Sequence, residues 1–180
     1  MKRYISNLFA GLIMVGLSLP ATSFAQSADQ IFRAAGSPHN PKVDIAFNRY
    51  YTSEGLAEIS KKIATAHPDL VKRVSIGKSY EGRDLWMLQI TNFKKGIADR
   101  KPGFYIDGNI HSNEIQGAEI SIYTAWYLTE NYGDVEYITD MLDNRIFYIV
   151  PTINPDARNH YMQEANTGSS PRSGMMPLDD

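Results

Sequence analysis

A strand–helix–strand pattern in the second half of the chain restricts its fold more than any other feature. Residues 104–107 and 146–150 are short apolar runs typical of strands, and residues 115–131 between them carry apolar side chains at helical spacing. Two strands joined by a helix normally lie parallel in one sheet. Upstream, runs at 71–76 and 85–90 are separated by a turn and predict an antiparallel hairpin. We therefore expect an α/β fold with a mixed parallel and antiparallel sheet flanked by helices.

Two further helices are expected outside this pattern. Residues 53–66 predict one, because Thr52 can cap it and apolar residues follow at helical spacing. Residues 137–142 predict a second, shorter one. After the last strand Gly, Ser, Pro, Asn and Asp dominate, so we expect a loop in which residues 154–156 fix a tight turn. The sequence ends at Asp180 within this loop, and we favour an incomplete domain over a disordered tail on a complete one.

The first 25 residues have the pattern of a secretory signal peptide. Two basic residues precede a mostly apolar run at 8–19, and small side chains predict cleavage between Ala25 and Gln26. A membrane anchor is the alternative, but the run is shorter than the roughly 20 apolar residues that cross a bilayer. We therefore expect an exported protein, periplasmic or secreted, with no membrane span in the mature chain.

The rest of the chain divides into two parts. Residues 26–50 contain few periodic apolar positions and predict a leader segment, while residues 51–180 make up the domain.

The composition excludes several kinds of site and partner. The formal net charge of the chain is −2, which does not indicate nucleic acid as a partner. The sequence contains no cysteine. Any metal site must therefore use nitrogen and oxygen ligands.

His111 and Glu114 are the candidate metal ligands. They lie three residues apart, just after a predicted strand and at the start of a predicted helix, which is where open α/β sheets form ligand sites. Imidazole nitrogen and carboxylate oxygen both bind zinc. The spacing alone is a weak signal, because a surface histidine followed by an acidic residue at a helix start gives the same pattern, which the helix dipole favours.

Three ordered motifs extend this pattern. Residues 107–114 read Asp-Gly-Asn-Ile-His-Ser-Asn-Glu, residues 79–84 read Ser-Tyr-Glu-Gly-Arg-Asp ahead of the strand at 86–90, and residues 150–156 read Val-Pro-Thr-Ile-Asn-Pro-Asp. Together they resemble zinc carboxypeptidases related to carboxypeptidase A over about residues 50–178. Ala157 departs from the glycine that the family usually has after its last motif. The resemblance implies a mixed sheet flanked by helices.

The resemblance also implies a role for particular residues. His111 and Glu114 become the first and second ligands of one Zn²⁺. The third ligand, the pair that binds the substrate carboxylate and the general-base glutamate are expected beyond Asp180, so no catalytic residue is assigned within this chain. Arg172 is the candidate for the arginine that polarises the scissile carbonyl, and Arg158 competes with it. The alternative is a solvated loop arginine.

The implied function is that of a metallocarboxypeptidase, a zinc-dependent protease that hydrolyses C-terminal residues from peptides or proteins with a free C-terminus. This chain would be its N-terminal fragment and inactive alone. Two alternatives remain open: a zinc-dependent amidase or deacylase on the same fold, and a non-catalytic exported domain if the chain ends at Asp180. His160 is expected to be a solvated surface histidine.

Overall fold

The computed structural model describes residues 36–165, which are built on a four-stranded sheet with strand order β1-β2-β4-β3. The strands are β1 (Val71–Lys78), β2 (Asp84–Ile90), β3 (Gly103–Asp107) and β4 (Ile146–Val150). β1 pairs antiparallel with β2 and β2 with β4, whereas β3 and β4 pair in parallel. The mixed sheet, the hairpin and the parallel pair expected from the sequence are confirmed.

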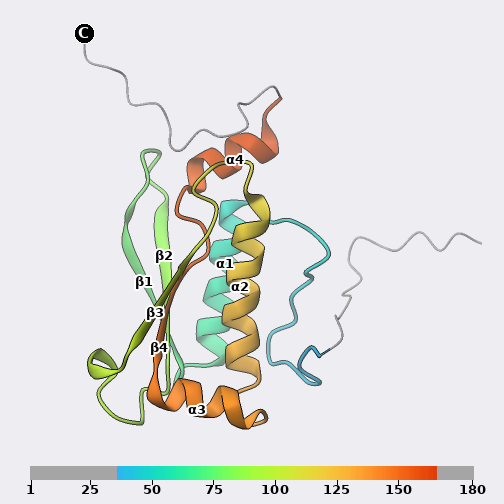
Figure 1. Ribbon diagram of the computed structural model, residues 1–180. Helices are drawn as coiled ribbons and strands as arrows, with labels where there is room; N and C mark the ends of the chain where they lie inside the picture. The colour runs from blue at the N-terminus through green and yellow to red at the C-terminus, as the bar shows by residue number, and fades with distance from the viewer. Residues whose placement is uncertain (1–35, 166–180) are drawn as a thin grey trace, which may run out of the picture.

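Two long helices lie side by side on one face of this sheet (Figure 1). They are α1 (Ser53–Ala66) and α2 (Ile115–Glu130), and both match the expected ranges to within one residue. Thr52 caps α1 as expected, because its side chain accepts a hydrogen bond from the Gly55 backbone N–H. The shorter α3 (Glu136–Asn144) packs at the end of the sheet where β4 begins (Figure 1). A three-residue 3-10 helix, η1, spans Ala98–Arg100.

The sequence predicted a loop after β4. This prediction is wrong, because the structure contains helix α4 (Pro155–Gln163) there. Asn154 caps this helix by accepting a hydrogen bond from the Ala157 N–H at 3.3 Å. Pro155 follows at the first helical position, where the backbone N–H that proline lacks would have no partner within the helix. The buried face of α4 carries Asp156 and Arg158 instead of an apolar stripe. Apolar periodicity therefore gave no sign of the helix.

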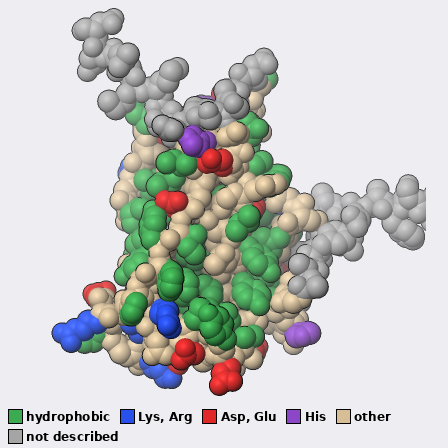
Figure 2. Space-filling view, viewed as in Figure 1, with side chains coloured by type: hydrophobic (Ala, Val, Ile, Leu, Met, Phe, Trp, Pro, Cys, Tyr) green, Lys and Arg blue, Asp and Glu red, His purple; other side chains and the backbone are tan. Residues whose placement is uncertain are grey.

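An apolar layer fills the space between the sheet and the long helices. Figure 2 shows that apolar side chains also reach the viewed surface, while charged groups gather at the end near α3. No helix within residues 36–165 is long and apolar enough to cross a membrane. The layer's fully covered side chains include Leu56, Ile63, Leu88, Ile90, Ala118, Ile122, Ala125, Leu142 and Ile149.

Glu130, at the end of α2, fixes the segment that precedes α1. Its carboxylate accepts hydrogen bonds from the backbone N–H groups of Lys42 and Val43 at 2.7 and 3.0 Å, and it lies 3.0 Å from Nε2 of His67. The Trp126 indole donates to the Val43 carbonyl at 2.7 Å. Buried hydrogen bonds to a charged group stabilise more than neutral ones, so this segment is firmly attached.

The end of β3 lies directly against the first turn of α2. A Cβ atom added to Gly108 would come within 2.5 Å of the Gly117 carbonyl oxygen, and one added to Gly117 would lie 3.3 Å from the Asn109 nitrogen. Backbone atoms cannot move aside as a flexible side chain can. The close approach of strand and helix therefore requires glycine at position 108.

Replacing Gly108 by alanine is expected to lower the free energy of unfolding by about 1–3 kcal/mol, because the added methyl group overlaps backbone atoms. Gly117→Ala is the matched control, since its contact is looser and alanine favours helix over glycine. Urea unfolding of both variants measures the difference. Equal losses for the two would contradict the contact described above.

Candidate metal centre

His111 and Glu114 converge in the short segment that joins β3 to α2. Nδ1 of His111 lies 2.8 Å from Oε1 of Glu114, and the His111 N–H donates to Oε2 at 3.1 Å. The side chains are 27% and 49% exposed, so solvent reaches both. An imidazole nitrogen and a carboxylate oxygen at one accessible point form a donor set that suits zinc. The two predicted ligands are therefore close enough to share an ion.

Two asparagines hold the backbone of this segment. Asn109 is buried, has a φ of 57°, and donates from Nδ2 to the His111 carbonyl at 2.7 Å. Asparagine tolerates this left-handed conformation better than most residues. Asn154 donates from Nδ2 to the Ile110 carbonyl at 3.0 Å. Sequence reasoning missed both roles, although an asparagine after glycine at a strand end is a signal for such a turn.

Within residues 36–165, no group of three or more His, Cys, Asp or Glu side chains is arranged to hold a metal ion. His160, on α4, faces Glu81 with Nε2 and Glu164 with Nδ1, and is 38% exposed. It therefore lies between two carboxylates and is not simply solvated as expected. The described part of the chain brings together two candidate ligands and no third.

Asp156 joins two of the sequence motifs. It accepts hydrogen bonds from the Ser79 hydroxyl at 2.8 Å, the Glu81 backbone N–H at 2.9 Å and the Arg83 guanidinium at 2.7 Å. Burial alone would raise the pKa of Asp156, but these hydrogen bonds outweigh it and hold the pKa below its ordinary value. The turn between β1 and β2 is thereby fixed to α4.

Arg158 is not the solvated loop arginine that the sequence allowed. Its side chain is 0% exposed, and Nη2 donates to Glu119 Oε1 at 2.5 Å. Burial lowers the pKa of Arg158, and the charge of Glu119 opposes this effect. A guanidinium enclosed in this way does not reach a substrate carbonyl. Arg172, the other candidate, lies outside the described residues, as does the expected signal peptide at 1–25.

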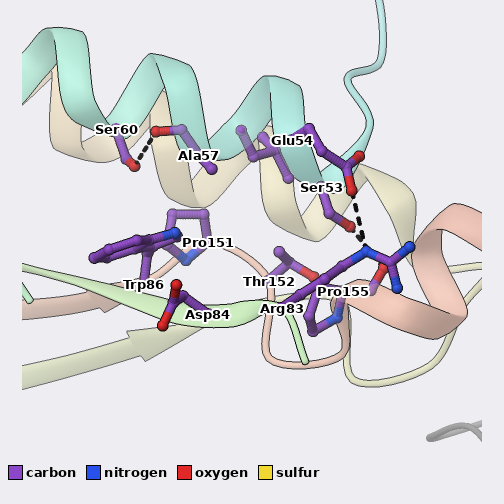
Figure 3. Close-up of a pocket in the computed structure, with 11 residues that line it drawn as sticks. Ser53, Glu54, Ala57, Ser60, Arg83, Asp84, Trp86, Pro151, Thr152 and Pro155 are labelled. Carbon is purple, nitrogen blue, oxygen red and sulfur yellow. Dashed lines mark hydrogen bonds and ion pairs between the residues drawn. The ribbon is translucent and has the colours of Figure 1, made fainter. Parts of the chain in front are cut away.

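A separate pocket of about 170 Å³ lies between α1, β2 and the segment after β4 (Figure 3). The Arg73 guanidinium carbon lies 3.2 Å from the ring centroid of Trp86, which faces this pocket. Trp86 is half-buried at this wall. Neither His111 nor Glu114 lines the pocket. Its lining is Ser53, Glu54, Leu56, Ala57, Ser60, Arg83, Asp84, Trp86, Pro151, Thr152 and Pro155.

The ion pairs of His160 predict a pH-dependent stability. Hydrogen bonds with Glu81 and Glu164 raise the pKa of His160 above its ordinary value. Their contribution is fully present below the unfolded pKa of about 6.5 and is lost as pH rises through the folded pKa. The stability difference between the parent and His160→Gln should therefore be larger at about pH 6 than at about pH 9.

Urea unfolding at several pH values measures this difference. Introducing Glu81→Gln into both proteins should reduce the pH dependence, because one of the two carboxylates that favour the imidazolium is removed. A difference that stays constant with pH would show that His160 contributes only packing.

Known proteins match this chain in sequence and structure. Residues 56–174 match the zinc carboxypeptidase family. Carboxypeptidase D of Drosophila melanogaster is 30% identical over 119 residues, which are 66% of this chain and 8% of that protein. A zinc carboxypeptidase of Saccharothrix mutabilis subsp. capreolus is 33% identical over 103 residues, or 57% of this chain and 23% of that protein. This chain therefore spans less than a quarter of the length of these two relatives.

The fold matches solved structures as well. Carboxypeptidase A from Helicoverpa armigera superposes with a TM-score of 0.59 and 26% sequence identity. The superposition covers 67% of this chain and 28% of that structure. The described sheet and helices thus correspond to part of a larger carboxypeptidase domain.

Proposed function

This chain belongs to the zinc carboxypeptidase family, and on that premise we propose that it supplies the first two zinc ligands of a metallocarboxypeptidase. The observation that carries the proposal is the convergence of His111 Nδ1 and Glu114 Oε1 at 2.8 Å, on an accessible segment after a strand. An incidental surface pair would form the same hydrogen bond, and the two asparagines that fix the segment favour a built site over that alternative.

His111 and Glu114 would hold the ion through Nδ1 and the carboxylate. Bound zinc supplies a Lewis acid that polarises a peptide carbonyl and lowers the pKa of a water molecule. We propose that the third ligand, the general base and the groups that bind a substrate carboxylate come from residues beyond Asp180 in a longer polypeptide. The small share of each relative that this chain matches supports this division.

Two further roles complete the proposal. Residues 1–25 would act as a signal peptide, so that the enzyme works after export, in the periplasm or outside the cell. Arg172 would donate to the scissile carbonyl of a peptide substrate. The burial of Arg158 supports this assignment, since it removes the nearer competitor.

Replacing His111 by alanine or Glu114 by alanine in the full-length protein should weaken zinc binding by more than about 100-fold, because each change removes a ligand. Loss of a group that only supports a ligand lowers metal affinity by about 10–100-fold. Zinc content and peptidase activity should fall together. His160→Gln is the matched control, because that histidine is similarly exposed and also faces carboxylates. Full zinc-dependent activity in a variant lacking both ligands would refute the metal site.

The substrate class is tested with paired peptides that end in a free carboxylate or in an amide. The proposal expects cleavage of the free peptide and little of the amidated one, and Arg172→Met should lower kcat by about 100-fold or more while zinc content is unchanged. Equal cleavage of both peptides would point to an amidase or deacylase. Binding of zinc without cleavage of any amide would favour a non-catalytic exported domain.

A further inference from the structure

One nitrogen of Arg158 connects the two ends of the segment that carries both candidate ligands. Nη1 donates to the side-chain oxygen of Asn109 at 2.8 Å and to the carbonyl of Ile115 at 3.0 Å. Asn109 lies two residues before His111, and Ile115 directly follows Glu114. The position of this guanidinium is therefore linked to both the start and the end of the segment.

Asn109 transmits the position of Arg158 to the backbone of the ligands. Its Oδ1 accepts from Arg158, which leaves Nδ2 facing the carbonyls of His111 at 2.7 Å and Ser112 at 3.4 Å. A side-chain amide has one acceptor and one donor end, so the guanidinium determines which end faces the segment. Without it Oδ1 keeps only the longer contact with the Thr152 hydroxyl at 3.5 Å, so the amide can turn and the segment then loses the bond that holds His111.

Arg158 is itself fixed from two other directions. Nη2 donates to Glu119 Oε1 on α2, and Nε donates to the Tyr51 carbonyl at 2.8 Å, just before α1. Glu119 Oε1 also accepts from the Tyr51 N–H at 2.9 Å. Because the guanidinium is fully buried, rotating it would leave charged donors without acceptors. Its orientation is therefore set by parts of the fold that carry no ligand.

We propose that Arg158 and Asn109 are positioning residues that hold His111 and Glu114 in a geometry ready for the metal. Neither is proposed to touch the metal or the substrate. The proposal rests on the proposed function, because it requires that these two side chains bind zinc. Groups that orient metal ligands commonly change metal affinity by 10–100-fold when removed.

The test measures zinc affinity and stability separately in the full-length protein. Arg158→Met removes every side-chain donor, and Asn109→Gly removes the amide while glycine keeps the left-handed backbone. Both should raise the zinc dissociation constant by about tenfold or more, measured by competition with a chromophoric chelator. Both should also alter the visible absorption spectrum of the Co²⁺-substituted protein, which reports ligand geometry.

Glu130→Gln is the matched control, because it weakens another buried hydrogen-bonded carboxylate at the opposite end of α2. It should reduce stability in urea yet change the zinc dissociation constant by less than about twofold, since that site is remote from the ligands. If Arg158→Met fails to fold, Asn109→Gly alone decides. Zinc affinity in Asn109→Gly equal to that of the Glu130→Gln control would overturn the positioning role.

The same experiment separates the two proposals. If His111→Ala abolishes zinc binding while Arg158→Met and Asn109→Gly leave it intact, the metal site stands and only the positioning role is lost. If His111→Ala leaves zinc binding unchanged, the proposed function fails and the positioning role falls with it.

Discussion

The contact between the backbones of Gly108 and Gly117 is the constraint on which the rest of the structure depends. It brings the end of β3 against the first turn of α2 more closely than any side chain would allow. The chain between them must then turn sharply outward, which places His111 and Glu114 at the surface with their polar atoms together. The left-handed Asn109 completes that turn. A looser junction would constrain the segment of the two candidate ligands less.

Helix α4 is attached by polar side chains, each directed at a different part of the fold. Asp156 binds the β1–β2 turn, Arg158 binds the segment of the candidate ligands, and Asn159 accepts from the Ser53 N–H at 2.9 Å at the start of α1. A net contribution of about 1.5–3 kcal/mol is typical of a hydrogen bond to a charged group. The helix thus connects the β1–β2 turn, the segment of the candidate ligands and the start of α1. Such an attachment requires one particular geometry, because each buried polar group is stable only when its partner is present.

The sequence was sufficient for the parts of the fold that bury apolar side chains. Apolar runs identified the four strands, and helical spacing identified α1 and α2. It was insufficient for α4, where the buried face is polar and resembles a loop in composition. For the candidate site, spacing and position after a strand identified His111 and Glu114. The burial of Arg158 could not be predicted from the sequence, because its partner Glu119 lies 39 residues away and nothing in one sequence links the two.

The attachment at Glu130 has a practical consequence for handling the protein. Lys42 and Val43 are held at the C-terminal end of α2, whereas the candidate ligands lie at its N-terminal end. A helix of 16 residues is about 24 Å long. A fluorescent dye, affinity handle or surface linkage introduced just ahead of Lys42 is therefore attached far from the ligand segment, at the opposite end of the domain. The end that carries the candidate ligands can then face the bulk solution while the other end is immobilised.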